Sequence, residues 1–405
     1  MVHQTISSSN ARAPKASSKI THMSKFLRRW ALCAAILGVL VLASCASGPP
    51  PTPAPAPPAA EGTRPTSATP AQTLLRARSR WVAVSFNDLP GWEADRLSEL
   101  WPALRRGCAR PAAEWAAFCQ QAAQVGEPGD PALRTWLEKR LQPYRVEALD
   151  GSVDGLLTGY FEPFVEASRQ PRGAYRVPLY GPPGDLASRK PYWTRQQIDT
   201  LPAAQAALRG REIAYVADPL EALVLQIQGS GRLRIKGADG SVQLVRAAFA
   251  GSNDQPYKSV FRWLIEQGEL KPDQASWQAV RAWAQRNPKR INELLWSNPR
   301  FVFFREEPLP DPALGPRGAQ GVALTQGRSI AVDPQSIPYG TPVWLGSTEP
   351  LSNAPLRRMA MAQDTGSAIT GAVRADYFWG WGEAAEQQAG RTKQPLRLWV
   401  LWPRP

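Results

Sequence analysis

The 405-residue sequence predicts a mainly β protein with peripheral helices. From Gly155 onward, short apolar or alternating runs stand between Gly and Pro residues, which is the pattern of strands and turns. A second stretch of this kind begins at Phe301 and continues to the end of the chain. Helical periodicity is confined to about residues 74–141 and 257–296. Since the helices lie outside the strand-rich stretches, we expect them to pack around β structure.

The first helical region places apolar residues three and seven positions apart, at Leu97, Leu100 and Leu104 and again at Trp115, Phe118 and Ala122. In the second helical region, Pro272-Asp273 and Pro288 are each predicted to open a helix. The first set of predicted strands is Leu156–Phe164, Arg176–Tyr180, Glu212–Val216, Leu223–Gln228, Leu233–Lys236 and Ser241–Phe249. The second set is Phe301–Phe304, Arg328–Val332, Pro342–Leu345, Arg357–Gln363 and Leu396–Leu401.

The N-terminus has the organisation of an export signal. A basic segment with Lys25, Arg28 and Arg29 precedes the apolar run 31–43, which is short for a membrane-spanning helix. The run ends in Leu-Ala-Ser-Cys45, which matches the lipobox of bacterial lipoproteins. We therefore predict that residues 1–44 are a lipoprotein signal peptide and that Cys45 is lipidated. An ordinary signal peptide, or a signal anchor with a chance cysteine, is the alternative interpretation.

Two further features bear on the site of the anchor. The residue after Cys45 is Ala46 rather than Asp, and this resembles lipoproteins sorted to the outer membrane. The periplasmic face of that membrane in a Gram-negative bacterium is the expected location. Residues 45–72 are rich in Pro and Ala, so this segment is predicted to form a semi-rigid stalk. The start codon could be Met1 or Met23.

Besides Cys45, the predicted mature chain holds two cysteines, Cys108 and Cys119, which lie in the first helical region. The predicted compartment is oxidising, so we expect them to form a disulfide, with two reduced and packed cysteines as the alternative. The formal charge is +14, and removing the six basic residues of positions 1–44 leaves +8. No Lys/Arg block of the nucleic-acid type is present, so nucleic acid is not an expected partner.

The histidine content restricts the chemistry. The chain holds two histidines, His3 and His22, and both precede the predicted processing site. Because the predicted mature protein has no histidine, it cannot use a Ser-His or Cys-His catalytic pair, and it lacks the commonest zinc ligand. We expect no metal and no organic cofactor. Acid–base chemistry must then come from Asp, Glu, Lys or Tyr.

Three aspartates near the C-terminus stand in distinctive surroundings. Asp333 lies in SIAVDPQSIPYGTPVWL, Asp364 in MAMAQDTGSAITG and Asp376 in RADYFWGWG. Aromatic neighbours, including Trp379, can desolvate Asp376 and raise its pKa, as a general acid requires, and can pack against sugar rings. The twelve-residue separation of Asp364 and Asp376 could bring two strand ends together. The alternatives are a core aromatic cluster beside a surface Asp376 and, above all for Asp333, a carboxylate that caps a turn.

The sequences around these three aspartates together resemble motifs of the membrane-bound lytic murein transglycosylase A family. Residues 158–163, TGYFEP, resemble the family's TGYxxP text. Residues 217–231 resemble its FxxQIQGSG motif, with Leu223 where the family has Phe. The motifs span about residues 156–402 in the family's order. The resemblance implies a double-psi β-barrel domain from residues 73–164 and 299–405, a second β-domain inserted at 165–298, and a groove between them for the glycan strand.

The resemblance also implies an activity and its residues. An exo-acting lytic transglycosylase cleaves the β-1,4 bond between N-acetylmuramic acid and N-acetylglucosamine of peptidoglycan without water. It leaves 1,6-anhydro-N-acetylmuramic acid ends and serves cell-wall turnover. The third aspartate, Asp376, is carried over as the catalytic acid and Asp364 as its catalytic support. The expected substrate-binding residues are Tyr160, Gln226, Gln228, Ser230, Asp333 and Trp379. Gln226, Gln228 and Ser230 are expected on a Gly-rich loop, with turn formation as their alternative role.

The expected partners are peptidoglycan glycan strands, outer-membrane lipid through acylated Cys45, and cell-wall synthesis or remodelling complexes. Two other functions compete with this one. A hydrolytic glycosidase on the same barrel would use a second carboxyl group and leave a reducing end. A non-catalytic glycan-binding lipoprotein would not need Asp376.

Overall fold

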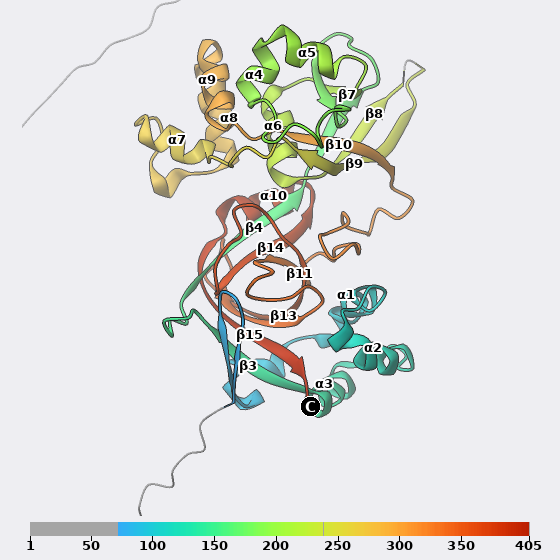
Figure 1. Ribbon diagram of the computed structural model, residues 1–405, viewed down its shortest axis with the longest axis vertical. Coiled ribbons are helices and arrows are strands. Elements are labelled where there is room, and N and C mark those ends of the chain that lie inside the picture. The colour runs from blue at the N-terminus through green and yellow to red at the C-terminus, as the bar shows by residue number, and fades with distance from the viewer. Residues whose placement is uncertain (1–71, 238, 405) are drawn as a thin grey trace, which may run out of the picture. The chain divides into compact units, whose positions relative to one another are not determined.

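The computed structural model describes residues 72–237 and 239–404. The predicted signal peptide, lipidated Cys45 and most of the stalk lie outside these residues. The described chain forms two β-sheets with helices packed around them (Figure 1). Within the described residues, no helix is long and apolar enough to span a membrane. The prediction of a mainly β fold is confirmed.

The larger sheet has nine strands in the order β1-β2-β3-β15-β12-β13-β11-β14-β4. Strand β15 also pairs with β4, so the six strands from β15 to β4 close into a ring. The strands are β1 (Thr73–Leu75), β2 (Arg80–Ala83), β3 (Leu141–Glu147), β4 (Gly155–Glu162), β11 (Ser329–Val332), β12 (Pro342–Thr348), β13 (Pro355–Asp364), β14 (Arg374–Trp381) and β15 (Lys393–Pro403). Apolar side chains from facing strands fill this ring, among them Leu157, Ile330, Val343, Ala362 and Val400.

The smaller sheet has six strands in the order β10-β9-β8-β5-β7-β6. They are β5 (Phe164–Ser168), β6 (Val177–Tyr180), β7 (Glu212–Val216), β8 (Gly231–Lys236), β9 (Val242–Ser252) and β10 (Val302–Pro308). The chain passes from the large sheet to the small one at Pro163, between β4 and β5. It returns after β10, because β10 pairs with β9 and not with the barrel strands. The return therefore falls later than the predicted boundary at residue 299.

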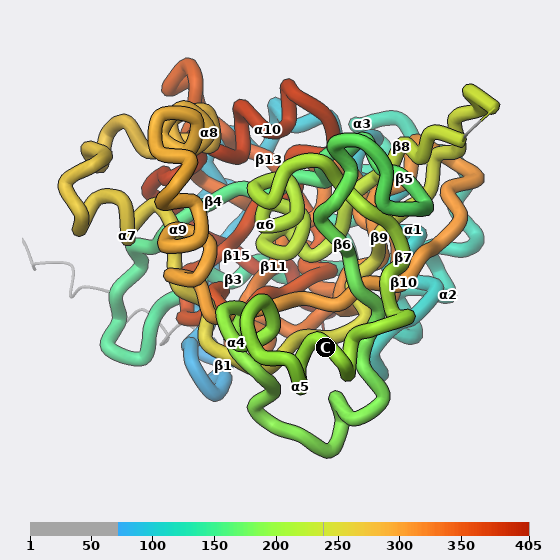
Figure 2. The backbone as a smooth tube through the Cα atoms, turned by 90° about the horizontal axis from the view of Figure 1, so that it is seen from above, coloured from blue at the N-terminus to red at the C-terminus, as the bar shows by residue number. Residues whose placement is uncertain are grey.

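The helices cover both sheets. Helices α1 (Trp101–Gly107), α2 (Ala116–Ala123) and α3 (Asp130–Arg140) pack on the large sheet through a shared apolar cluster. Helices α4 (Arg195–Thr200), α5 (Pro202–Leu208), α6 (Pro219–Gln228), α7 (Val260–Glu266), α8 (Trp277–Arg286) and α9 (Ile291–Ser297) belong to the inserted segment. Helix α10 (Gly382–Arg391) follows β14 and contacts β4. Figure 2 shows α6 among the strands of the smaller sheet, and α6 contacts β6, β7 and β10.

The prediction of a strand at Leu223–Gln228 is wrong, because these residues form most of α6. The Asp218 carboxylate accepts a hydrogen bond from the backbone amide of Leu220 at 2.8 Å, and Pro219 occupies the first turn. Gly229, at φ 80°, ends the helix in the left-handed conformation. Residues 222–226 are all buried, so this run does not alternate between buried and exposed positions. A short apolar run of this kind has no periodicity that separates helix from strand.

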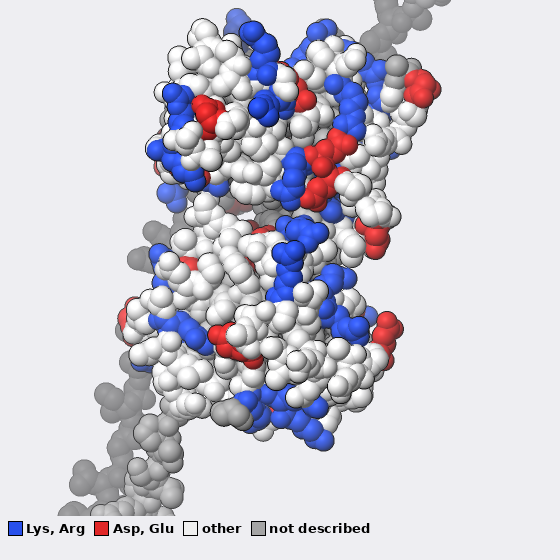
Figure 3. All heavy atoms as spheres, turned by 45° about the vertical axis from the view of Figure 1, so that its right-hand side comes forward, with Lys and Arg blue, Asp and Glu red and all other residues white. Residues whose placement is uncertain are grey.

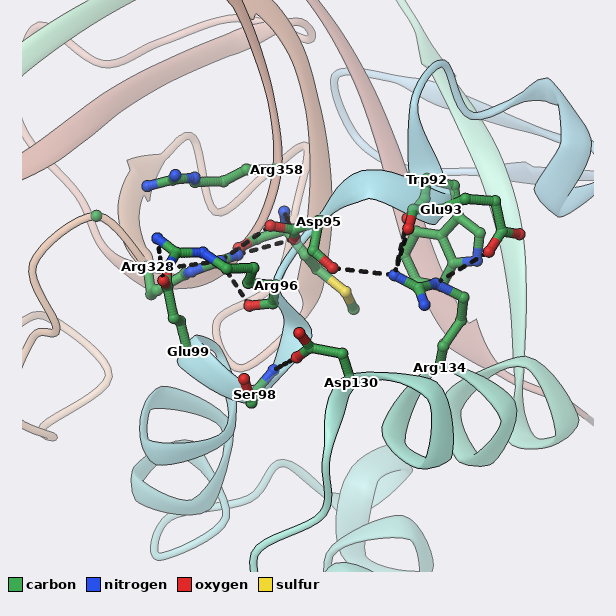
Figure 4. A network of polar contacts seen from close by, with 12 residues as sticks. Trp92, Glu93, Asp95, Arg96, Ser98, Glu99, Asp130, Arg134, Arg328 and Arg358 are labelled. Atoms are coloured by element: carbon green, nitrogen blue, oxygen red, sulfur yellow. Dashed lines mark hydrogen bonds and ion pairs between the residues drawn. The ribbon is translucent and has the colours of Figure 1, made fainter.

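A disulfide and a buried ion pair anchor the N-terminal helices. Cys108 and Cys119 form a disulfide between the end of α1 and α2, with Cα atoms 5.2 Å apart. Arg328, just before β11, donates to both carboxylate oxygens of Asp95 at 2.8 and 2.9 Å, and to Glu99 at 3.0 Å (Figure 4). Arg328 and Asp95 are almost fully buried, so each charge depends on the other. This contact joins the helical segment to a strand of the ring.

Candidate active site

The strand register places the two C-terminal aspartates in one row across the large sheet. Ala331 on β11 pairs with Asp364 of β13 on one side and with Asp376 of β14 on the other. Asp376 in turn pairs with Thr158 of β4. Neighbouring strands lie about 4.8 Å apart, so the Cα atoms of Asp364 and Asp376 are separated by roughly 10 Å. The structure thus brings Asp364 and Asp376 together as predicted for two strand ends.

Asp376 is held by one hydroxyl group. The Thr158 hydroxyl donates to Asp376 Oδ1 at 2.6 Å. Burial raises the pKa of Asp376, while the Thr158 hydrogen bond and the Arg374 guanidinium oppose this rise. A carboxyl group with a raised pKa and one oxygen engaged is suited to donate a proton from its other oxygen.

Asp364 has more hydrogen-bond donors around it. The Tyr160 hydroxyl donates to Oδ2 at 3.0 Å, and the backbone amide of Ala319 donates to Oδ1 at 3.0 Å. Burial raises the pKa of Asp364 to about 6, although these donors and the Thr365 amide lower it and Asp376 adds to the rise. Because donors to both oxygens favour the ionised form, Asp364 is suited to act as a nearby negative charge.

Tyr160, the donor to Asp364, lies on the strand that also carries Thr158, the donor to Asp376. It lies two residues after Thr158 on β4, so both side chains extend from the same face of the strand. Burial raises the pKa of Tyr160 well above its usual value, and Asp364 and Asp376 add to the effect. Tyr160 therefore remains a neutral hydrogen-bond donor at physiological pH. Its ring packs against Phe378, with ring centroids 5.2 Å apart.

The Ala319 amide comes from a hairpin that spans residues 315–324. Backbone hydrogen bonds join Gly315 to Leu324 and Gly318 to Val322. The Gln320 side chain donates to the carbonyl of Gly107 at 3.1 Å, at the end of α1. The hairpin thus connects Asp364 to the helical segment that carries the disulfide.

Asp333 lies outside the row, just after β11. Its carboxylate accepts hydrogen bonds from the backbone amides of Gln335 at 3.0 Å and Gly371 at 2.8 Å, and Asp333 is buried. These contacts tie the turn after β11 to the loop between β13 and β14, which separates the two site aspartates. They favour the turn-capping role over direct substrate contact.

Trp379 lies on the face of β14 opposite Asp376, since successive side chains alternate along a strand. Its ring packs 4.7 Å from that of Tyr377, and its indole nitrogen donates to the Thr392 hydroxyl at 2.9 Å. The structure therefore does not bring Trp379 to the carboxyl pair, and its contacts are those of a core aromatic residue.

The expected Gly-rich loop is absent from residues 226–228, which belong to α6. Gln226 is buried and accepts a hydrogen bond from Arg195 at 2.6 Å. Gln228 accepts from the backbone amide of Phe161 at 3.0 Å, beside Tyr160, and is partly exposed. Ser230 is buried and follows the helix. Of these three residues, Gln228 is thus directly tied to the strand of Tyr160.

The sequence patterns predicted no role for two side chains that interact with Asp376 or with its partner Thr158. Arg374 donates to the Thr158 hydroxyl at 2.8 Å. Tyr257 follows β9 of the inserted segment; burial raises its pKa, a hydrogen bond with Ser259 lowers it, and Asp376 contributes a further rise. Period-two spacing to Asp376 could have identified Arg374, whereas the approach of Tyr257 depends on tertiary contacts.

No group of three or more His, Cys, Asp or Glu side chains is arranged as metal ligands in the described part of the chain. On the face drawn in Figure 3, Lys and Arg side chains lie in several groups, some of them beside Asp and Glu.

Comparison with known proteins identifies relatives of this chain. The MltA specific insert domain family matches residues 156–305 and the 3D domain family matches residues 328–402. Membrane-bound lytic murein transglycosylase A of Vibrio cholerae is 32% identical over 285 residues, which are 68% of this chain and 73% of that protein.

Two solved structures share the fold. The lytic transglycosylase LtgG of Burkholderia pseudomallei is 45% identical with a TM-score of 0.57, over 83% of this chain and 98% of that one. MltA of E. coli with bound chitohexaose is 25% identical with a TM-score of 0.60, over 83% of this chain and 95% of that one. With these matches and the paired aspartates of the barrel, the chain belongs to the membrane-bound lytic murein transglycosylase A family.

Proposed function

We propose that this protein is a peptidoglycan lytic transglycosylase that cleaves the β-1,4 bond between N-acetylmuramic acid and N-acetylglucosamine. The observation that carries the proposal is the setting of Asp376, a partly buried carboxyl group of raised pKa with one oxygen engaged by Thr158. Relatives of this chain are named lytic murein transglycosylases, and the E. coli relative was solved with chitohexaose.

A single carboxyl group can carry out both steps of this reaction. Asp376 protonates the bridging oxygen, the bond from that oxygen to C1 of the muramic acid breaks, and Asp376 becomes a carboxylate. The carboxylate then takes the proton of the C6 hydroxyl of the same sugar, and the C6 oxygen bonds to C1. The proton given in the first step is recovered in the second, so no water is consumed. The product ends in a 1,6-anhydro-N-acetylmuramic acid.

Asp364 supports the positive charge that develops at C1. Its two oxygens accept from Tyr160 and from the Ala319 amide, so it is held as a fixed negative charge two strands from Asp376. Tyr160 and Gln228 are the proposed glycan contacts. The charge of Asp376 contributes to the raised pKa of Tyr257 in the inserted segment, and this electrostatic interaction supports a glycan groove between the barrel and the insert. The remaining predicted binding residues are proposed to support the fold around the two aspartates. They are Gln226, Ser230, Asp333 and Trp379.

The same carboxyl pair supports a second candidate, a hydrolase. Inverting glycosidases hold their two carboxyl groups about 6.5–9.5 Å apart to admit a water molecule. Asp364 and Asp376 lie two strands apart in the same row of the sheet, so a second carboxyl group is present near the proposed acid. The two candidates differ in the fate of C1, because hydrolysis adds a water oxygen there and transglycosylation does not.

The test is digestion of purified murein in ¹⁸O-labelled water, followed by mass spectrometry. The wild-type protein should release muropeptides with 1,6-anhydro ends and no label. Asp376→Asn should lose at least about 10²–10⁴-fold in rate while still binding glycan. Asp273→Asn, at an exposed position outside the site, is the matched control and should behave as wild type. Label at C1 would make the enzyme a hydrolase, and near-normal turnover of Asp376→Asn would refute the catalytic assignment.

We also propose that the protein is held at the periplasmic face of the outer membrane by an acylated Cys45. Support comes from the lipobox at residues 42–45 and from the term "membrane-bound" in the names of its relatives. One acyl chain gives marginal binding, so stable anchoring needs more than one. Cys45→Ser should remove the protein from the outer-membrane fraction. Exo action from strand ends is expected and should release disaccharide units before shortening the bulk of the glycan.

A further inference from the structure

Three side chains form a line that ends at the proposed acid. The Arg374 guanidinium donates to Thr158 Oγ1 at 2.8 Å, and the Thr158 hydroxyl lies 2.6 Å from Asp376 Oδ1. Thr158 and Asp376 are direct partners in the parallel pairing of β4 with β14, and Arg374 stands two residues before Asp376 on the same strand face. Strand pairing, together with the side-chain hydrogen bonds, therefore holds Arg374, Thr158 and Asp376 in this arrangement.

The direction of the hydrogen bonds follows from the chemistry of the groups. A guanidinium only donates, so Thr158 Oγ1 must accept from Arg374. A hydroxyl group has one proton, and the acceptor that the structure gives it is Asp376 Oδ1. Oδ1 is therefore an acceptor whether Asp376 is ionised or neutral. In the neutral acid the proton must then be carried by the other oxygen, Oδ2.

We propose that Thr158, fixed by Arg374, is a positioning residue that reserves Asp376 Oδ1 as an acceptor and leaves Oδ2 as the oxygen that gives and recovers the catalytic proton. This inference rests on the proposed role of Asp376 as the acid–base group. In the first step the Oδ2–H bond breaks and the proton goes to the bridging oxygen as the C1–O bond breaks. In the second step Oδ2 takes the C6 hydroxyl proton as the C6 oxygen bonds to C1.

The same hydrogen bond sets how strong an acid Asp376 is. The charged or titratable groups near Asp376 are Arg374 on its own strand, Tyr160 on β4, Asp364 on β13 and Tyr257 after β9. Burial raises the pKa of Asp376, and the Thr158 hydroxyl counters that rise by stabilising the carboxylate. Without the hydroxyl, Asp376 becomes a weaker acid and its oxygens lose their fixed orientation.

The test compares Thr158→Val, which has the same shape without the hydroxyl, with Thr158→Ser, which keeps it. Initial rates on purified murein strands are measured across pH with the mature protein. For Thr158→Val, kcat should fall about 10–100-fold with little change in KM. The alkaline limb of the kcat/KM profile, where the acid loses its proton, should move up by about one to two pH units. Thr158→Ser should restore both rate and profile to near wild type.

Two further variants keep the test decisive. Thr135→Val, on the exposed face of α3, is the matched control and should leave rate and profile unchanged. Thr158→Ala is measured in place of the Val variant if circular dichroism shows that the latter is unfolded, and the same loss and the same shift are expected.

The inference is overturned if a folded variant without the hydroxyl keeps the wild-type profile, or if Thr158→Ser is as impaired as Thr158→Val. Its failure is distinguishable from failure of the proposed function. If the wild type releases no anhydro ends, or if Asp376→Asn remains active, the proposed function fails. If the wild type releases anhydro ends and Asp376→Asn is inactive, but the Thr158 variants behave as wild type, this inference alone is wrong.

Discussion

Replacing Asp364 by Asn should make the protein more stable at neutral pH while it slows the reaction. Burial raises the pKa of the Asp364 carboxyl from 3.8 to about 6 in the folded protein. A folded-state pKa above the unfolded one means that the folded protein binds the proton more tightly. The stability that this provides is complete below about pH 4 and is lost as pH rises through about 6. Above pH 7 the ionised Asp364 therefore disfavours the folded state.

The magnitude follows from the difference between the two pKa values. A rise from 3.8 to about 6 is about two units, and each unit is worth 1.36 kcal/mol, so the ionised group costs about 3 kcal/mol. Asparagine has nearly the shape of the neutral acid and never ionises. Asp364→Asn should therefore gain up to about 3 kcal/mol at pH 7.5 and almost nothing at pH 4.

Urea denaturation of the mature protein, followed by tryptophan fluorescence at both pH values, measures the difference. Asp88→Asn is the control of opposite sign. Asp88 is exposed and its pKa is lowered by hydrogen bonds from Ser85, so its replacement should reduce stability at pH 7.5. The reasoning is refuted if Asp364→Asn is less stable than wild type at pH 7.5, or if its effect is equal at the two pH values. Murein digestion by the same variant should be slower, because the fixed charge near C1 is gone.

Three further predictions concern the scaffold around the site. Arg328→Met leaves the buried Asp95 carboxylate without its partner and should lower the free energy of unfolding by about 3–5 kcal/mol, while apolar replacement of both residues should recover most of the loss in urea denaturation. Reducing the disulfide should lower Tm and slow murein digestion, since the end of α1 holds the 315–324 hairpin that binds Asp364; unchanged turnover of the reduced protein would contradict this link. Gly155→Ala places a Cβ 1.9 Å from the Val373 carbonyl oxygen and should cost about 1–3 kcal/mol in thermal unfolding, whereas Gly390→Ala in α10, with open space around it, should cost nothing.

The sequence predicted most strands of the barrel and the aspartates that the barrel brings together. Strand β13 is predicted at Arg357–Gln363 and forms over Pro355–Asp364, between turn residues at both ends. The motifs around the three aspartates also identify the family from the sequence alone. The strand prediction for α6 is wrong because its continuous apolar run at residues 222–225 lacks the periodicity that identifies a helix.

Only the tertiary structure decided which side chains meet. Thr158 and Asp376 are 218 positions apart in the chain, yet strand pairing places them side by side. A shift of register by one residue would turn Asp376 to the opposite face, and Trp379 shows that a near neighbour in sequence can lie on that face. Local sequence determines what a segment can form. The register between distant strands depends on how the whole core packs, and for that reason the Thr158–Asp376 contact could be found only in the folded protein.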